Sequence, residues 1–307
     1  MWKAAAVTET LEQASVDRAE LQRRTLNSLR LAQVPGQAAV AGMVAVVTLL
    51  ASDLLGSDRL AGIGTASFTL GAALSMVPLA AFMRRRGRRP GMAGALLIGA
   101  AGSAIAATGG QLRFFPLFVI GMVLFGAGQA STLQGRYVAA DLAEPDHQAT
   151  AIAAIVWIGA LGAIFGPLLT PFEKVVAESV GLDELIGPFV FATLFFLVAA
   201  AVVWTRLRPD PLAVVGGINP NATRTRPIKQ VRASVGVIAR SSNAKLGFAA
   251  MAISQAVMVG VMTMTPPHMK DHDHADLSAF VIAVHIVGMY GLAPFVGRTV
   301  ERIGRVR

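Results

Sequence analysis

The sequence predicts an all-α protein that crosses a membrane several times. Hydrophobic residues make up 54% of its 307 residues and charged residues only 15%, whereas soluble domains average about 45–50% and about 25%. The apolar residues gather in windows of roughly 20 residues, the length that a helix needs to cross a bilayer core. The net charge of +9 comes from short basic segments between these windows. That placement marks membrane topology rather than a nucleic-acid-binding face.

Composition also bounds the chemistry. The chain has no cysteine, which excludes disulfides, thiolate metal sites and cysteine nucleophiles. Gly126 and Gly128 lie inside an apolar window with no strand before them, so they predict helix packing rather than a phosphate-binding loop. The first 30 residues are rich in Glu, Gln and Arg, unlike a cleavable signal. We therefore expect neither an enzyme nor a bound cofactor.

The first predicted unit is a six-helix bundle over residues 31–205, preceded by a cytoplasmic segment over residues 1–30. That segment alternates charged and apolar positions at helical spacing, which suits a helix on the membrane surface and equally a solvated leader. The six spans are expected at about 34–55, 60–83, 92–109, 114–133, 149–169 and 186–204. In the third span, small residues four apart predict close helix contacts. An acidic outer loop containing Glu173 and Glu184 is expected after the fifth span.

A basic, cytoplasmic linker is predicted over residues 206–245, and two further spans follow at about 246–265 and 277–296. Five arginines crowd residues 84–89, and other basic turns follow the sixth and eighth spans. Arginine-rich turns are costly to translocate, so all three are expected inside. Both chain ends are then predicted to be cytoplasmic.

The arginine-rich turn after the second span resembles the loop signature of the major facilitator superfamily, Gly-x-x-x-Asp-Arg-x-Gly-Arg-Arg/Lys. The matching residues are Arg85, Gly87, Arg88 and Arg89. A second copy near the chain end matches at Gly297, Glu301, Arg302, Gly304 and Arg305. The resemblance implies a secondary transporter of the bacterial inner membrane with two six-helix bundles. On that expectation residues 246–307 supply only two helices of the second bundle, and the chain is truncated after the eighth.

A second resemblance lies in the fifth span. Gly162, Gly166 and Pro167 are similar to the Gly-x-x-x-Gly-Pro motif of antiporters in this superfamily, although Thr170 and Pro171 depart from it. The alternative is an ordinary close-packing motif kinked by Pro167. Beside the paired loop signatures we favour the antiporter interpretation. It implies proton-coupled export of a small organic compound by alternating access, with the bilayer, the substrate and a proton as partners.

The basic turn lacks the signature's own acid, because Arg84 stands in its place. We expect a carboxylate of the next cytoplasmic turn, Asp141, Glu144 or Asp146, to pair with the arginines and close the inner side in one state. The alternative is that the turn serves only as a topology anchor.

Ionisable or polar side chains at membrane depth are candidates for substrate or proton binding. They are His285 in the eighth span, Arg136 in the fourth, Asp53 in the first and Gln255 in the seventh. The three ionisable ones have structural alternatives: a packed imidazole for His285, a snorkelling arginine for Arg136 and a water-exposed carboxylate for Asp53.

A metal-ion exporter is a second possible function. His268, Asp271, His272 and His274 follow the seventh span and are predicted outside, where imidazole and carboxylate suit zinc, nickel or copper(II). Met251, Met258 and Met262 share a helical face with Gln255. We favour a solvated loop above an apolar wall. A third possibility is a membrane fragment that does not transport, because four helices would be missing.

Overall fold

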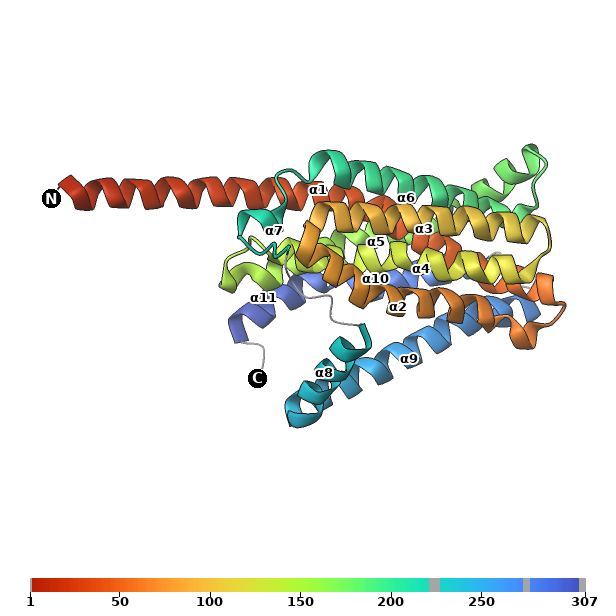
Figure 1. Ribbon diagram of the computed structural model, residues 1–307. Helices are drawn as coiled ribbons and strands as arrows, with labels where there is room; N and C mark the ends of the chain where they lie inside the picture. Colours follow the sequence, from red (N-terminus) through yellow and green to blue (C-terminus); the bar gives the residue numbers. More distant parts are fainter. Residues whose placement is uncertain (1, 221–226, 273–276, 304–307) are drawn as a thin grey trace.

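The computed structural model describes residues 2–220, 227–272 and 277–303. Within these residues all regular structure is helical and no strand is formed. Seven of the described helices are long and apolar enough to cross a membrane, and a shorter apolar segment follows at Phe280–Val296. The predicted all-α membrane fold is confirmed (Figure 1).

The first six long helices form one bundle (Figure 1). They are α1 (Trp2–Leu55), α2 (Gly62–Arg86), α3 (Arg88–Gln111), α4 (Phe115–Ala140), α5 (Gln148–Ser179) and α6 (Gly187–Arg206). Single turns of 3-10 helix at Asp58–Leu60, Pro145–His147 and Glu184–Ile186 connect several of them. The remaining helices are α7 (Pro211–Val214), α8 (Pro227–Arg240), α9 (Ser242–Asp271), α10 (Ser278–Gly291) and α11 (Ala293–Ile303).

The N-terminal segment is not a separate element. Helix α1 runs without interruption from Trp2 to Leu55 with Pro35 inside it, and its first part extends beyond the rest of the bundle (Figure 1). The membrane-surface position predicted for residues 1–30 stays a prediction. Two hydrogen bonds anchor α1 where it enters the bundle. Gln22 Nε2 donates to the carbonyl of Ala139 at 2.8 Å, and Ser28 Oγ donates to that of Arg206 at 3.0 Å.

Small residues set the contact between α3 and α4. A Cβ on Gly99 would lie 2.6 Å from the Cα of Gly128, and Gly102 and Gly121 meet the facing backbone as closely. Such contacts replace the hydrophobic drive that lipid does not supply. The close helix contacts predicted for the third span are therefore confirmed.

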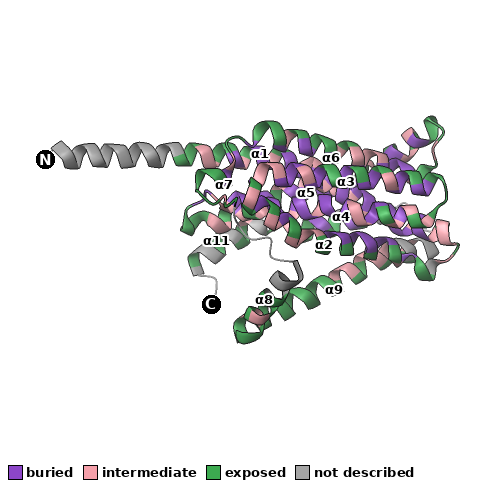
Figure 2. Ribbon diagram, viewed as in Figure 1, coloured by how far each residue is buried: buried purple, intermediate pink, exposed green. Residues whose placement is uncertain are grey.

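Aromatic rings fill the centre of the bundle. Phe118, Phe125, Phe189 and Phe196 are fully buried. The rings of Phe118 and Phe189 lie 5.8 Å apart and those of Phe125 and Phe196 lie 5.0 Å apart, which joins α4 to α6. These separations lie within the range favoured by aromatic pairs. The core therefore sits between α1, α3, α4 and α6 (Figure 2).

The last helices surround this bundle differently. In α10, Ile282 and Ile286 are buried against Ala163 of α5, whereas α9 is mostly exposed along its length (Figure 2). The predicted eighth span consists of two helices: α10 ends at Gly291, before Leu292, and α11 begins at Ala293, after it. Pro294 explains the interruption, because it has no N–H to donate and its ring clashes with the carbonyl four residues earlier.

Candidate functional site

The candidate site begins at the basic turn, residues 84–89, between α2 and α3. Gly87 ends α2 with φ of 103°, donates its N–H to the carbonyl of Met83 at 2.8 Å, and leads directly into α3. A Cβ on Gly87 would also overlap the carboxylate of Asp210. Glycine is thus required here both by the backbone conformation and by the approach of another side chain.

Arg88 binds Asp141 through two parallel hydrogen bonds. Its Nε lies 2.8 Å from Asp141 Oδ2 and its Nη2 lies 3.0 Å from Oδ1, and both side chains are only 15% exposed. This is the strong, planar pairing that a guanidinium makes with a carboxylate. Asp141 is one of the three acids expected from the sequence; Glu144 and Asp146 lie exposed in the same turn. The pair joins the start of α3 to the end of α4.

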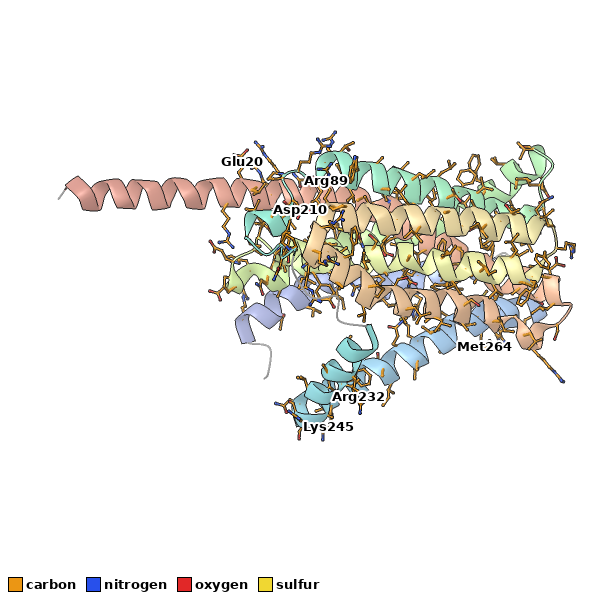
Figure 3. The ribbon with its side chains drawn as sticks, viewed as in Figure 1. Glu20, Arg89, Asp210, Arg232, Lys245 and Met264 are labelled. Carbon is orange, nitrogen blue, oxygen red and sulfur yellow. The ribbon has the colours of Figure 1, made fainter. Side chains whose placement is uncertain are left out.

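Arg89 connects the basic turn to the segment after α6. Its backbone N–H donates to Asp210 Oδ2 at 2.8 Å, and its Nε donates to the carbonyl of Trp204 at 2.9 Å. The guanidinium carbon lies 4.2 Å from the centre of the Trp204 ring, a cation–π contact. Arg89 and Asp210 meet at the end of the bundle from which α1 extends (Figure 3). We call the contacts of Arg88 and Arg89 with Asp141, Asp210 and Trp204 the basic-turn network.

Asp210 was not predicted from the sequence, yet it has two roles. Its Oδ1 accepts from the backbone N–H of Leu212 at 3.0 Å and so caps α7, while Oδ2 accepts from Arg89. The order Asp-Pro before a helical turn is a recognisable start signal. Other contacts reinforce this meeting point: Asn219 N–H donates to the carbonyl of Arg84 at 2.9 Å, and Arg85 reaches that of Pro220 at 3.5 Å.

Replacing Asp210 by alanine is expected to lower the free energy of unfolding by about 1–2 kcal/mol, because a helix cap and a second backbone acceptor are lost together. Thermal unfolding of the purified chain in detergent checks this. Asp183→Ala is the matched control, since the exposed Asp183 carboxylate caps a single helical turn by accepting from Leu185 N–H at 2.9 Å and binds no second helix among the described residues. Equal destabilisation by both variants would contradict the role given to Asp210.

The antiporter-like motif lies where α5 meets α1. A Cβ on Gly166 would lie 2.6 Å from the carbonyl oxygen of Ala38, and a Cβ on Gly162 would overlap the carbonyl of Val34. Pro167, which directly follows Gly166, is also buried. The two helices run in the same direction, because Gly162 faces Val34 and Gly166 faces Ala38. We call this contact the α1–α5 seam.

The seam continues beyond the expected end of the fifth span. Helix α5 extends to Ser179, and the spacing of Gly162, Gly166, Thr170, Glu173 and Ala177 places them on one face. All five are buried, and Glu173 is only 1% exposed. The expected assignment of Glu173 to an acidic outer loop is therefore wrong. Two prolines in this region did not end the helix, because its buried face is held against α1.

The other ionisable candidates do not gather at one place. Asp53 pairs with Arg113 at 2.7 Å on the surface, at the end of the bundle opposite the basic turn. Arg136 is half-buried in α4. His285 is exposed on α10, and Gln255 is exposed on α9. Their predicted roles in substrate or proton binding stay predictions.

The predicted metal loop is partly helical. Helix α9 continues through Pro266 and Pro267 to Asp271, so His268 lies in the helix rather than in a loop. The rings of His268 and His272 lie 4.3 Å apart. His274 lies outside the described residues, and among the described ones no group of three potential ligands forms. The second loop signature lies in α11 at Gly297, Glu301 and Arg302, whereas Gly304 and Arg305 are outside the described residues.

Several known proteins are similar to this chain in sequence. Two MFS-type transporters of Bacillus subtilis (strain 168), the uncharacterized YddS and YdeG, are each 36% identical to this chain over 93% of it and 66% of their own length. The riboflavin transporter RfnT of Brucella anthropi is 29% identical over 92% of this chain and 68% of its own. The chain thus spans about two thirds of the length of these curated relatives.

The fold resembles that of a solved transporter, and a family model matches most of the chain. The crystal structure of the human organic anion transporter MFSD10 superposes with a TM-score of 0.62 at 18% identity, covering 91% of this chain and 73% of that one. The model of the Major Facilitator Superfamily matches residues 34–307. The chain therefore belongs to the Major Facilitator Superfamily of membrane transporters.

Proposed function

We propose that this chain acts in secondary active transport and exports a small organic compound in exchange for protons by alternating access. The observation that carries the proposal is the basic-turn network. It ties the start of α3, the end of α4 and the segment after α6 at one end of the bundle. A transporter that alternates between two states needs contacts of this kind that form at one end and release there.

The geometry supports a releasable contact rather than a simple topology anchor. An anchor would need only arginines in water near lipid headgroups. Arg88, by contrast, makes two hydrogen bonds to Asp141, and each of these side chains is only 15% exposed to solvent. Charge-assisted, bidentate pairs of this type depend strongly on geometry. A small displacement of α4 relative to α3 would therefore weaken the pair sharply, and a return would restore it.

The proposed orientation follows from the positive charges. The basic turn and the arginines after α6 lie at the same end as the extended start of α1 (Figure 3). We place this end, residues 1–30 and the linker 206–245 on the cytoplasmic side of the plasma membrane. Residues 31–205 then form the first bundle, and residues 246–307 begin the second.

Export in exchange for protons is the direction that the antiporter-like seam supports. Gly162 and Gly166 bring α1 and α5 into backbone contact, and Pro167 is buried beside them. Among the relatives, RfnT is named as a riboflavin transporter, so a planar organic solute of that class is a suitable first probe. No arrangement of the described residues favours the metal exporter in the same way.

The proposal is tested in a bacterial host that lacks its principal exporters. We expect expression of the 307-residue chain to raise tolerance to at least one drug or dye from a panel that includes riboflavin analogues and divalent metals. The gain should vanish when a protonophore collapses the proton gradient. The Arg88→Ala variant, matched for membrane abundance, is the inactive control. Tolerance confined to metal ions would replace this proposal by the metal exporter, and tolerance that survives the protonophore would remove proton coupling.

A further inference from the structure

One buried acid has no place in the transport machinery described so far. Glu173 lies in α5, two turns beyond Gly166 on the same helix face, and is 1% exposed. Its Oε2 is fully enclosed and has no hydrogen-bond partner among the described residues. Buried charged groups are rare unless they are paired. The position therefore calls for a physical explanation.

Two helices, α6 and α1, pack near Glu173. At the start of α6, a Cβ on Gly187 would overlap the backbone carbonyl of Glu173, so α6 passes directly against this turn of α5. The register of the α1–α5 seam places α1 on the other side. Thr48 lies six residues beyond Gly42, which faces Gly166, and Glu173 lies seven residues beyond Gly166. At about 1.5 Å per residue the two side chains are at the same level.

Two neutral polar groups accompany the carboxyl group at this level. The hydroxyls of Thr48, on α1, and Thr170, one turn before Glu173, are buried and also lack a partner among the described residues. Thr170 shares the seam face of α5 with Glu173, and Thr48 shares only its height along the bundle; buried polar atoms without a partner are unusual, since most such atoms are satisfied. A helix contact selected only for stability would fill these positions with apolar side chains.

The charged groups nearby are engaged elsewhere. On α5, Lys174 pairs with Glu184 at 3.3 Å, and Glu178 is exposed. On α1 and the α3–α4 connection, Asp53 pairs with Arg113 at 2.7 Å. On α10, His285 is exposed, and before α6 the exposed Asp183 caps a single helical turn. Within the described residues, no cation is thus bound to the Glu173 carboxyl group.

We propose that Glu173 is a proton-binding site, and that its proton holds the far end of the α1–α5 seam closed. The inference rests on the proposed proton exchange in that it assigns the coupling proton to this residue. In the closed arrangement described here the group is a neutral carboxylic acid. On deprotonation the O–H bond breaks, the proton passes to water and a carboxylate remains. That anion requires water or donors, so the seam between α1, α5 and the start of α6 opens to hydrate it.

Infrared difference spectroscopy of the 307-residue chain in lipid nanodiscs tests proton binding directly. Between acidic and alkaline buffer, the wild type should lose a carboxylic C=O band, and the Glu173→Gln variant should lack that band throughout. Glu178→Gln, an exposed acid on the same helix, should retain it, and Glu173→Asp should restore a shifted band. A spectrum that Glu173→Gln leaves unchanged overturns the proposal. Circular dichroism and gel filtration confirm that each variant is folded.

Thiol labelling tests whether the proton closes the seam. Because the chain has no cysteine, Ala177→Cys provides a single reporter in the seam, one turn beyond Glu173, and Ser179→Cys provides an exposed reference. Relative to that reference, labelling by a membrane-impermeant maleimide should accelerate from acidic to alkaline buffer. The added Glu173→Gln substitution should abolish the acceleration; an unchanged profile overturns the closing role. Neither experiment uses a transported solute, so each outcome is separate from success or failure of the proposed export.

Discussion

Replacing Gly162 by alanine is expected to prevent the chain from reaching its folded state in the membrane. The new methyl group would overlap the carbonyl oxygen of Val34, and both are backbone positions on rigid helices. Because neither atom belongs to a flexible side chain, the helices must separate along the whole α1–α5 seam. Overpacking of a core usually costs about 1–3 kcal/mol, and a clash with backbone belongs at or above the upper end.

The Gly162→Ala experiment is read by gel filtration of a fluorescent fusion and by thermal unfolding in detergent. Gly94→Ala is the matched control, since Gly94 lies in α3, where a Cβ would meet nothing within 4 Å. That substitution should be neutral or stabilising, because alanine is favoured over glycine in a helix by up to about 1 kcal/mol. If Gly162→Ala gave as much folded, monodisperse protein as Gly94→Ala, the close α1–α5 contact described here would be contradicted.

Breaking the Arg88–Asp141 pair should have the second-largest effect. Removing one partner of a buried ion pair costs about 3–5 kcal/mol, and the 15% exposure of these side chains argues for the lower part of that range. We expect Arg88→Ala and Asp141→Ala each to lower thermal stability strongly, while the double variant loses little more. Export should fall to the background level in all three, because the network is incomplete in each.

The surface pair between Arg113 and Asp53 is the control for this double-mutant cycle. Its side chains are 60% and 43% exposed, and exposed pairs contribute only about 0–1 kcal/mol. Reversing the charges with Arg88→Asp and Asp141→Arg should restore part of the stability lost in the single variants. Additive losses at Arg88 and Asp141, as expected for independent residues, would show that the pair does not act as a unit.

Local sequence patterns predicted much of the fold. Apolar windows placed the long helices, and small residues four apart predicted the α3–α4 contact that Gly99 makes with Gly128. The composition of residues 84–89 identified the basic turn, and the missing acid in that turn directed attention to three acids of the next turn, Asp141, Glu144 and Asp146, of which Asp141 makes the pair. These successes share a cause, because hydrophobic length, residue size and charge act within a few residues of the chain.

The features that were missed depend on contacts far along the chain. Asp210 was overlooked because the segment after α6 reads as basic, and only the fold brings it 121 residues back to Arg89. Sequence alone places Glu173 in a loop, because further acids, Glu178, Asp183 and Glu184, follow it. The helical spacing from Gly162 to Ala177 could have shown that α5 continues, but burial of that face requires α1. The interruption at Leu292 was signalled by Pro294 alone.

The contact between α5 and α10 has a mechanical consequence. Backbone atoms of α1 and α5 interlock at Gly162 and Gly166, so in that part of the α1–α5 seam the two helices cannot slide past each other and move together. The α10 contact consists of Ile282 and Ile286 resting on Ala163, with Met262 and Tyr290 at its edge. Aliphatic side chains form no hydrogen bonds that would resist displacement, so α10 can slide over α5 at this contact. Motion of α10 relative to the first bundle is therefore expected as shear across Ala163.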